Sequence, residues 1–527
     1  MNQLRNGTAY IVGSGIAGLA SALYLVRDGK LRGEQVCIFE EGEVFGGSLD
    51  ASGTVESGYT MRGERMLSPK FDCLFDMLSE IPSYDDPSIS ARDDIFEFTR
   101  QAGWYSTTRL IDRAGRPVDV SSLGLDGPDR LSLLKLMMSR EASLGKRRIV
   151  DVLPPHFFMT NFWFMWRTMF AFQDWHSAAE MRRYLLRFIH MLPAMAKMNT
   201  VHRTRYNQYY SIVLPVQRWL QQRGVRFESR TCVRDMAFHP VPGRHHVSAL
   251  KLRQCQSEAE IPLQDHDVVI VTAGSMTAGS TFGSMSTPAG LARDEADGAW
   301  ALWKRIAAGR PGFGHPDVFS SDIDKSKWLS FTVTTRTPRL RQRLETMTGR
   351  PYGREGLISF KESNWLMTLK ACHHPCYPGQ PEDAAVWWGY GLNPDAVGNF
   401  VNKKMSDCTG EDILREAFLH LHFEDDLEDL IQHSQAIPCM MPYVTSQFMP
   451  RVRGDRPQVI PPGSVNLAFV GQYCEVPDDT VFTVEYSVRS AKIAVKSLLG
   501  LPMTIPPVYK GWRNPLVLWR ALRESLR

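Results

Sequence analysis

The chain has 527 residues, too many for one ordinary hydrophobic core, so we expect two or three domains. Its 43% hydrophobic and 22% charged content is typical of a soluble globular protein. A net charge of +4, from 61 basic and 57 acidic residues, gives no nucleic-acid-binding signature, so we expect no nucleic-acid partner.

Nine cysteines are scattered along the chain without the spacing of a disulfide framework, which indicates reduced thiols and a reducing compartment. The first residues, Met1 to Arg5, lead straight into a strand and lack the pattern of a signal peptide. No uninterrupted apolar run reaches the roughly 18–20 residues that span a bilayer. We therefore expect a cytoplasmic protein, which can still touch a membrane surface.

The first strongly patterned segment is a strand, Tyr10 to Val12, followed by Gly-x-Gly-x-x-Gly and a helix. In this motif Gly13 permits a tight turn, Gly15 lets the backbone approach a pyrophosphate, and Gly18 lets the helix pack closely on the strand. The helix N-terminus offers unpaired N–H groups and the positive end of a dipole to phosphates. The pattern predicts a dinucleotide-binding site.

A second strand, Val36 to Phe39, ends at Glu40, whose carboxylate can accept hydrogen bonds from ribose hydroxyls. A loop with Gly46, Gly47 and Ser48 follows, and its backbone can approach phosphates or a flavin. An acid followed after a few residues by Gly-Gly is common in FAD enzymes and much less so in NAD dehydrogenases. The pattern therefore favours FAD as the cofactor.

Two later stretches carry polar side chains in unusual surroundings. The segment Gly58 to Met66 places two arginines, a glutamate and a tyrosine in a loop flanked by glycine. The segment 157–195 is dense in aromatic and methionine side chains, which suits either a buried helix pair or the wall of an apolar ligand tunnel. Polar groups within it, such as Tyr184, need partners or a purpose.

Apolar strand-like runs that return to the first domain occur near Val233, at 268–275 and at 465–472. An acid and a threonine ahead of the run Val481 to Leu499 mark a helix N-terminus. We therefore predict an α/β fold with a discontinuous Rossmann-like FAD-binding domain, an inserted α+β substrate-binding domain and a helical C-terminal tail. The predicted boundaries are 1–70 plus 225–290 plus 455–500, then 71–224 plus 291–454, and finally 501–527.

The motif Cys372-His373-His374-Pro375-Cys376 invites a metal interpretation. It contains a proline and lacks a second ligand pair, so we expect no metal site. The tail from Lys510 to Arg527 combines arginines with tryptophan and leucine. Such a basic amphipathic helix either lies on an anionic membrane surface or docks on the body of the protein, and both interpretations stay open.

Taken together, several of these stretches resemble the oleate hydratase family, also called myosin-cross-reactive antigens. The matching segments span nearly the whole chain, and the central and C-terminal ones are specific to that family: Gly13–Gly18, Arg62–Met66, Thr168–Ser177, Arg182–Tyr184, Tyr206–Tyr209 and Val481–Ser487. The resemblance implies addition of water across a cis double bond of a free unsaturated fatty acid, giving a hydroxy fatty acid. It also implies bound FAD without net redox change.

The resemblance assigns roles to individual residues. Tyr184 matches the family's proton-donating tyrosine, and Gln208 matches a residue of the substrate site. An isolated alkene is a poor base, so its protonation needs a well-placed acid in a dry site that stabilises carbocation character. The cofactor-binding residues that the pattern and the resemblance imply are Gly13, Gly15, Gly18, Glu40, Gly47, Ser48, Arg65, Val233, Gly471, Thr483 and Ser487.

Two departures from the family's pattern concern the chemistry. The family commonly has a water-activating glutamate after the arginine of the flavin-side loop, but here Arg65 is followed by Met66, which cannot take a proton. Glu64 is then the nearest candidate for that role. The family's carboxylate-binding Thr-x-Asn-x-x-x-His aligns on 370–376, where Lys370, His373 or His374 can bind a carboxylate by charge instead.

Three alternatives remain open at this point. A flavin-dependent double-bond isomerase or an amine-oxidase-like oxidoreductase would share the cofactor motifs but not the context of Tyr184, Arg182-Arg183-Tyr184. A lipid-binding flavoprotein without activity is motivated by Met66. The chain has no extended arm before the first strand, and such an arm can contribute to dimer contacts in the family, so we expect either a monomer or a homodimer.

Overall fold

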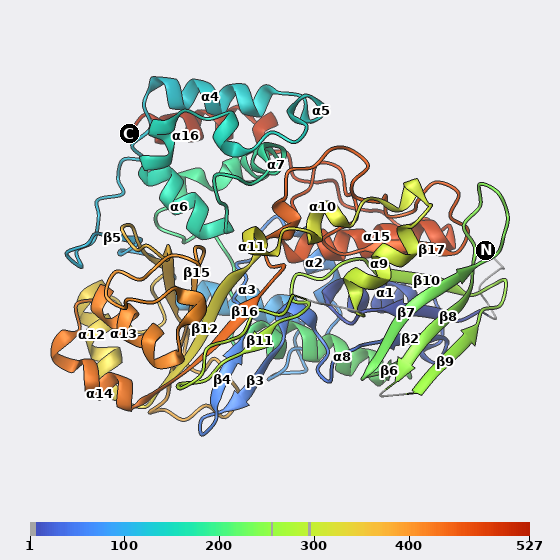
Figure 1. The fold of residues 1–527 in the computed structure, drawn as a ribbon, viewed down its shortest axis with the longest axis horizontal. Helices are drawn as coiled ribbons and strands as arrows, with labels where there is room; N and C mark the ends of the chain where they lie inside the picture. The colour runs from blue at the N-terminus through green and yellow to red at the C-terminus, as the bar shows by residue number, and fades with distance from the viewer. Residues whose placement is uncertain (1–6, 255–256, 294–296) are drawn as a thin grey trace.

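A five-stranded parallel sheet forms the centre of one half of the molecule (Figure 1). The computed structural model describes residues 7–254, 257–293 and 297–527. The strand order is β17-β10-β1-β2-β6. The strands are β1 (Ala9–Val12), β2 (Val36–Phe39), β6 (Arg226–Glu228), β10 (Val268–Thr272) and β17 (Leu467–Val470). Most of them are short apolar runs, as expected for strands that are covered on both faces.

Helices cover the parallel sheet and pack on one another. α1 (Ile16–Arg27) and α15 (Val484–Leu499) contact the sheet and each other, and α8 (Leu214–Gln221) packs on α1. Ten consecutive residues of α1, from Ile16 to Leu25, are buried, so this helix is apolar all round rather than amphipathic. A three-stranded antiparallel sheet lies at the edge of this half: β7 (Thr231–Phe238), β8 (Val247–Gln254) and β9 (Ser257–Pro262).

A seven-stranded sheet forms the second half, with the order β11-β16-β12-β15-β14-β13-β5. Its neighbours pair antiparallel except β13 with β5. The strands are β5 (Leu110–Ile111), β11 (Thr281–Phe282), β12 (Trp328–Thr335), β13 (Ile358–Phe360), β14 (Met367–Ala371), β15 (Ala385–Gly391) and β16 (Ser434–Met441). A hydrophobic cluster joins the sheet to α12 (Pro338–Thr348), α13 (Gly410–His420) and α14 (Leu427–Gln432).

A hairpin, β3 (Ala51–Thr54) and β4 (Gly58–Met61), links the two halves. The backbone N–H groups of Tyr59 and Met61 donate to the hydroxyls of Thr334 and Thr332 on β12, at 2.9 and 3.0 Å. The loop that follows Met61 is therefore carried from the parallel sheet to the face of the second sheet. This places residues 62–66 between the two halves.

A helical layer lies above the seven-stranded sheet, at the upper left of Figure 1. It contains α4 (Gly127–Met138), α5 (Glu141–Leu144), α6 (Asn161–Phe170), α7 (Ala178–Phe188), the 3-10 turn η5 (Ile189–Ala194) and α16 (Pro515–Ser525). The C-terminal helix α16 packs on η5, and Arg130 of α4 donates to the carbonyl of Ser525 at 3.0 Å. The remaining helices are α2 (Asp72–Leu78), α3 (Ala91–Ala102), α9 (Ala299–Ala307), α10 (Asp317–Ser320) and α11 (Ile323–Ser326).

Several ends of elements differ from the sequence-based expectation. The last long helix begins at Val484 rather than Val481, because Phe482 has a φ of +65° and the Thr483 hydroxyl caps the helix by accepting from the Tyr486 N–H. The tail helix is confined to Pro515–Ser525. The domain boundaries stay a prediction.

The described cysteines are free and buried, and Cys255 lies outside the described residues. No described helix is both long and apolar enough to cross a bilayer.

Candidate active site between the two sheets

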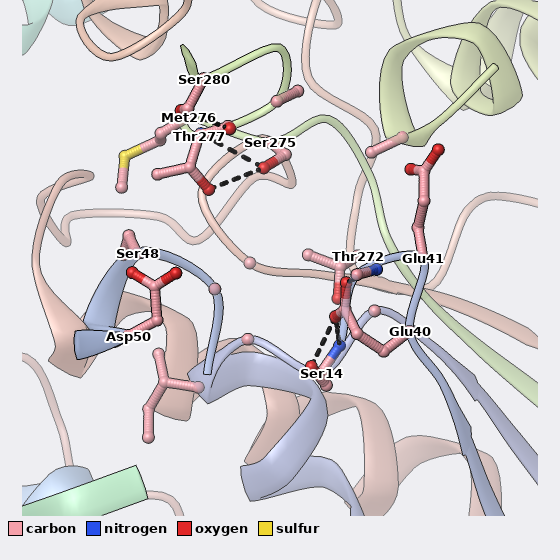
Figure 2. Close-up of a pocket in the computed structure, with 18 of the residues that line it drawn as sticks. Ser14, Glu40, Glu41, Ser48, Asp50, Thr272, Ser275, Met276, Thr277 and Ser280 are labelled. Carbon is pink, nitrogen blue, oxygen red and sulfur yellow. Dashed lines mark hydrogen bonds between the residues drawn. The ribbon is translucent and has the colours of Figure 1, made fainter. Parts of the chain in front are cut away.

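The largest of the cavities described below, about 660 Å³, lies at the carboxyl ends of β1, β2, β10 and β17 (Figure 2). Ligands bind at this edge in open parallel sheets. In Figure 2 Ser48 and Asp50 lie on one side of it, Ser14 and Glu40 on another, and the loop from Ser275 to Ser280 stands across from them. We call this space the large cavity.

The glycine-rich turn has the geometry that its sequence predicts. Gly13 has a φ of +93°, in the region that favours glycine. A Cβ on Gly18 would lie 2.0 Å from the Gly13 carbonyl oxygen, so only glycine permits this approach of helix and strand. A Cβ on Gly15 would meet no atom within 4 Å and would project beside the N-terminus of α1, where the space is left open. This cradle fits a phosphate group.

Glu40 lies beside the glycine-rich turn on the wall of the large cavity. One carboxylate oxygen accepts from the Ser14 N–H at 3.1 Å and the Ser14 hydroxyl at 2.5 Å, and the other accepts from the Gly42 N–H at 2.9 Å (Figure 2). The carboxylate is thus fixed at the end of β2. Its remaining acceptor capacity suits a ribose hydroxyl.

Of the predicted cofactor-binding residues, all except Gly18 line the large cavity: Gly13, Gly15, Glu40, Gly47, Ser48, Arg65, Val233, Gly471, Thr483 and Ser487. Sequence reasoning missed Asp50, Thr272 and the loop Ser275–Ser280, which also line it. The Thr272 hydroxyl is buried without a hydrogen-bond partner among the described residues, so it is available to a ligand. The position of Thr272 at the end of a parallel strand was the available signal.

A second cavity of about 100 Å³ adjoins the first, and we call it the apolar cavity. Arg65, Phe482, Thr483 and Val484 line both spaces, so these residues form the partition between them. Met66 and Tyr184, predicted from different parts of the sequence, meet on the wall of the apolar cavity. Its other walls come mainly from α6, α7 and the second sheet, so the aromatic stretch 157–195 is both buried core and cavity wall.

Tyr184 is 1% exposed and its hydroxyl donates to the Val481 carbonyl at 2.5 Å. Burial, with help from the Glu180 and Asp479 carboxylates, raises the pKa of Tyr184 well above its ordinary value, while Arg65 opposes that shift. The rings of Phe170, Phe172 and Phe188 surround it with centroids 4.9–5.5 Å away. Tyr184 is therefore a neutral phenol in a dry, aromatic environment.

Arg65 places a cation at the partition. Its guanidinium lies over the Phe482 ring at 5.4 Å and has no ion-pair partner among the described residues. Burial lowers the pKa of Arg65 to about 10, so the side chain remains charged at neutral pH. Gln208 holds its backbone: the amide oxygen accepts from the Arg65 N–H at 3.0 Å, and the amide nitrogen donates to the Arg65 carbonyl.

A third, small space of about 20 Å³ lies beyond Glu64, and we call it the polar chamber. Glu64 lines both this chamber and the apolar cavity. Its carboxylate lies 3.9 Å from the Lys370 ammonium and 4.0 Å from the Arg203 guanidinium. Burial lowers the pKa of both Lys370 and Arg203, and Glu64 counteracts this for each of them. Arg203 had not been singled out in the sequence, since an isolated arginine carries no local signal.

The two histidines of the 372–376 motif are placed differently. His373 lines the polar chamber, and burial together with Arg354 and Lys370 lowers its pKa to about 4, so it is neutral near pH 7. His374 lies outside the three spaces, and its Nε2 contacts the Pro381 carbonyl at 3.0 Å. Charge toward a carboxylate would therefore come from Lys370 and Arg203 rather than from the histidines.

Comparison with known proteins adds the family context. A model described as the MCRA family matches residues 6–496. The chain is 39% identical over 509 residues to an oleate hydratase of Streptococcus pyogenes, covering 95% of this chain and 86% of that protein. It is 32% identical over 538 residues to a linoleate hydratase of Lactiplantibacillus plantarum, covering 94% of each.

Among solved structures, cyclohexylamine oxidase from Brevibacterium oxydans has a similar fold. The TM-score is 0.52 at 13% identity, with 94% of this chain and 99% of that chain covered. This likeness concerns the fold alone. It confirms the predicted α/β class, with a Rossmann-like parallel sheet and inserted antiparallel sheets.

Proposed function

This chain belongs to the MCRA family, and from that membership we propose that it adds water across a cis double bond of a free unsaturated fatty acid. The observation that carries the proposal is the meeting of Tyr184 and Met66 on one apolar cavity, directly beside the large cavity. An apolar cavity with few polar side chains on its wall suits an acyl chain better than a polar substrate. The product is a hydroxy fatty acid.

We infer that FAD occupies the large cavity. The open cradle at Gly15, the fixed carboxylate of Glu40 and the unpartnered Thr272 hydroxyl fit a dinucleotide. When bound, FAD supplies an isoalloxazine ring that shapes and polarises the neighbouring wall without net redox change. Arg65, on the partition, offers a positive charge toward that group and toward the apolar cavity.

Tyr184 is the proposed proton donor. Its O–H first turns from the Val481 carbonyl toward the alkene. The O–H bond then breaks as one alkene carbon gains the proton, and positive charge develops at the other carbon. The raised pKa keeps the phenol protonated until reaction, and the Arg65 guanidinium favours the tyrosinate that remains. The surrounding aromatic rings exclude water and present their negative faces to the developing cation.

Water attacks the developing cation and loses one proton to an acceptor, and a proton returns to the tyrosinate of Tyr184 to complete the cycle. Met66 occupies the wall where the family commonly has a glutamate, so we propose Glu64, which also lines the apolar cavity, as that acceptor. For the fatty acid carboxylate we propose the polar chamber, with Lys370 as the charged partner, Arg203 behind it, and Gln208 and His373 on the wall. Gln208 then acts through Arg65, whose backbone it holds.

Partner contacts beyond the substrate follow from the helical layer. On α16 and at the residue that follows it, Leu516, Trp519, Leu522 and Leu526 are 53–62% exposed, and neighbouring α4 exposes Leu131, Leu134 and Met138. Arg520 and Arg523 are exposed on the same helix. We propose that this surface, which we call the tail face, rests on an anionic membrane surface, from which the substrate is drawn.

One experiment tests the activity and its donor. The protein with FAD and oleate in water enriched in heavy oxygen is expected to give a hydroxy acid that carries the label. Tyr184→Phe is expected to lose at least about a hundredfold in rate, the lower range of general acid catalysis. Tyr390→Phe is the matched control, because Tyr390 is also buried on the apolar cavity but bonds to the Thr168 carbonyl.

Other outcomes would assign another function. An unhydrated product with a shifted double bond indicates an isomerase. Bleaching of the flavin by substrate, followed by reoxidation in air, indicates an oxidase. If hydration occurs but Tyr184→Phe retains the rate, the donor assignment is wrong and the hydratase proposal stands.

A further inference from the structure

A single peptide group, between Val481 and Phe482, is held from both sides. On one side its carbonyl oxygen accepts the Tyr184 hydroxyl at 2.5 Å. On the other side its N–H, that of Phe482, donates to the side-chain oxygen of Gln472. Because the C=O and N–H of a trans peptide point in opposite directions, the peptide connects Gln472 to Tyr184 in one line of hydrogen bonds. Such chains polarise their members cooperatively.

Both polar atoms of the Gln472 side chain form hydrogen bonds. Its oxygen accepts from Phe482, and its nitrogen donates to the Thr483 carbonyl at 3.0 Å and to the Ser487 hydroxyl at 2.8 Å. The residue follows Gly471 at the end of β17 and lines the large cavity. Gln472 therefore ties the rigid parallel sheet to the loop before α15.

That loop needs to be held. Phe482 has a φ of +65°, a left-handed conformation that residues other than glycine seldom adopt, and Asp478 has the same value. Turning the Val481–Phe482 peptide over would bring the φ of Phe482 to a negative value and relieve this strain, but would remove the acceptor from Tyr184. Strained conformations persist only where surrounding contacts fix them. At the other end of the loop, the buried Asp479 is fixed by Arg489 at 2.8 Å.

We propose that Gln472 is a positioning residue that fixes the Val481–Phe482 peptide and, through it, the place of the Tyr184 hydroxyl at the apolar cavity. The proposal rests on the proposed role of Tyr184 as proton donor. Gln472 itself touches neither the acyl chain nor the reacting carbons, because it lines the large cavity and not the apolar one. Its effect on the reaction is exerted through one peptide group.

Gln472→Met, which keeps the length of the side chain and removes its hydrogen bonds, is the decisive variant. We expect kcat for oleate hydration to fall at least tenfold, because small misplacements of a catalytic group are costly. Because Gln472 lines the large cavity, kcat is expressed per flavin-bound protein, with bound flavin read from its absorbance, and KM is expected to change less than threefold. Gln380→Met is the matched control: the amide of Gln380 also holds backbone groups, those of Cys376, Tyr377 and Ala384, in the segment between β14 and β15. Because Cys376 lines the polar chamber, the two variants are compared in kcat and not in KM.

Gln472→Glu gives a second readout, rescue of the one hydrogen bond on which the inference rests. A carboxyl group accepts from the Phe482 N–H in either protonation state, whereas the thioether of methionine is only a weak acceptor. The kcat of Gln472→Glu is therefore expected to exceed that of Gln472→Met at least threefold.

A Gln472→Met kcat within twofold of the parent, or a kcat of Gln472→Glu no higher than that of Gln472→Met, overturns the inference. Equal losses of kcat in Gln472→Met and Gln380→Met also overturn it. Tyr184→Phe, assayed in parallel, separates the two levels: if that variant retains hydration, the donor assignment has failed, whatever Gln472 does. If Tyr184→Phe is inactive and Gln472→Met is normal, only the positioning role has failed.

Discussion

At the scale of single residues, Met66 stands where the resemblance to the family leads us to expect a water-activating glutamate. Its thioether lies on the wall of the apolar cavity together with Tyr184. We expect Met66→Glu to raise kcat at least tenfold, since a positioned general base typically contributes about 10²–10⁴. Steady-state hydration of oleate measures this.

The control for that variant is Met66→Gln, which has nearly the same size and polarity but cannot take a proton. Equal rates in Met66→Gln and Met66→Glu would show that polarity rather than basicity matters there. No change in either variant would show that water activation does not limit the rate, because another group already supplies it. Glu64 is the proposed group.

Local sequence patterns identified some of these residues and not others. Gly13, Gly15 and Glu40 could be assigned because the dinucleotide motif is contained in one short stretch whose geometry follows from its glycines. Arg203 could not be assigned, because its role depends on Glu64 and Lys370, which are far away in the sequence. The same holds for Gln472. Its proposed role depends on a hydrogen bond to a peptide group ten residues further on and, through that peptide, on a tyrosine of another helix.

At the scale of elements, α16 has its apolar side chains exposed although it is docked on η5. We expect the double variant Arg520→Glu and Arg523→Glu to bind vesicles containing phosphatidylserine at least tenfold more weakly, because each basic residue near such a surface contributes about 1 kcal/mol. Co-sedimentation with vesicles measures this, and hydration of soluble substrate should persist. Undiminished binding would remove the tail face from the proposal.

The matched control reverses Arg100 and Arg113, which are exposed on other parts of the molecule. It changes the net charge by the same amount without touching the tail face. A loss of binding equal to that of the α16 variant would indicate a general charge effect, and purely zwitterionic vesicles should bind neither protein well.

The turn η5, beneath α16, contains a histidine that should make folding sensitive to acid. Burial, with Arg187 and Lys70 nearby, lowers the pKa of His190 to about 4. The unfolded chain titrates near the ordinary 6.5, so between about pH 6.5 and 4 the unfolded state binds more protons, and the free energy of unfolding falls as the pH drops. The contribution of neutral His190 to the free energy of unfolding is fully present above pH 6.5 and is lost as the pH falls toward 4.

We expect His190→Gln to reduce the fall in Tm between pH 6.5 and 4.5 by on the order of 2 °C. Thermal unfolding followed by circular dichroism measures it, and His239→Gln, at an exposed position, serves as the control. An unchanged pH dependence in His190→Gln would show that other groups dominate the acid sensitivity.

Element types were easier to predict than their ends. The parallel strands and α1 follow from continuous apolar runs, whose burial needs no long-range information. The start of α15 was predicted three residues early, because Phe482 has a positive φ and cannot belong to the helix. A phenylalanine gives no sign of such a conformation in the sequence. Tertiary contacts through Gln472 fix that conformation.

At the scale of the whole molecule, the apolar cavity is smaller than its proposed occupant. Its volume of about 100 Å³ lies below the roughly 300–1,000 Å³ typical of ligand pockets. A neighbouring space of about 10 Å³, lined by Met66 and several further methionines, continues it toward η5. Binding of an acyl chain therefore requires these flexible side chains to move apart and join the spaces.

We expect saturating oleate to slow amide hydrogen exchange in α6, α7 and η5 more than in the parallel sheet, because the chain fills the space between these helices. Exchange read by mass spectrometry measures this, with stearate as a ligand of equal length that cannot be hydrated. Equal changes throughout the molecule, or none in these helices, would place the acyl chain elsewhere.

The loop between the two halves has a consequence for how this protein can change. Glu64, Arg65 and Met66 all line the apolar cavity, and each also lines a different second space: the polar chamber, the large cavity and the methionine-lined space, respectively. Inserting or deleting one residue here would shift these three side chains by one position each. The lining of all the spaces would then change at once. We therefore expect this loop to tolerate exchanges of side chains at a fixed length and not changes of its length.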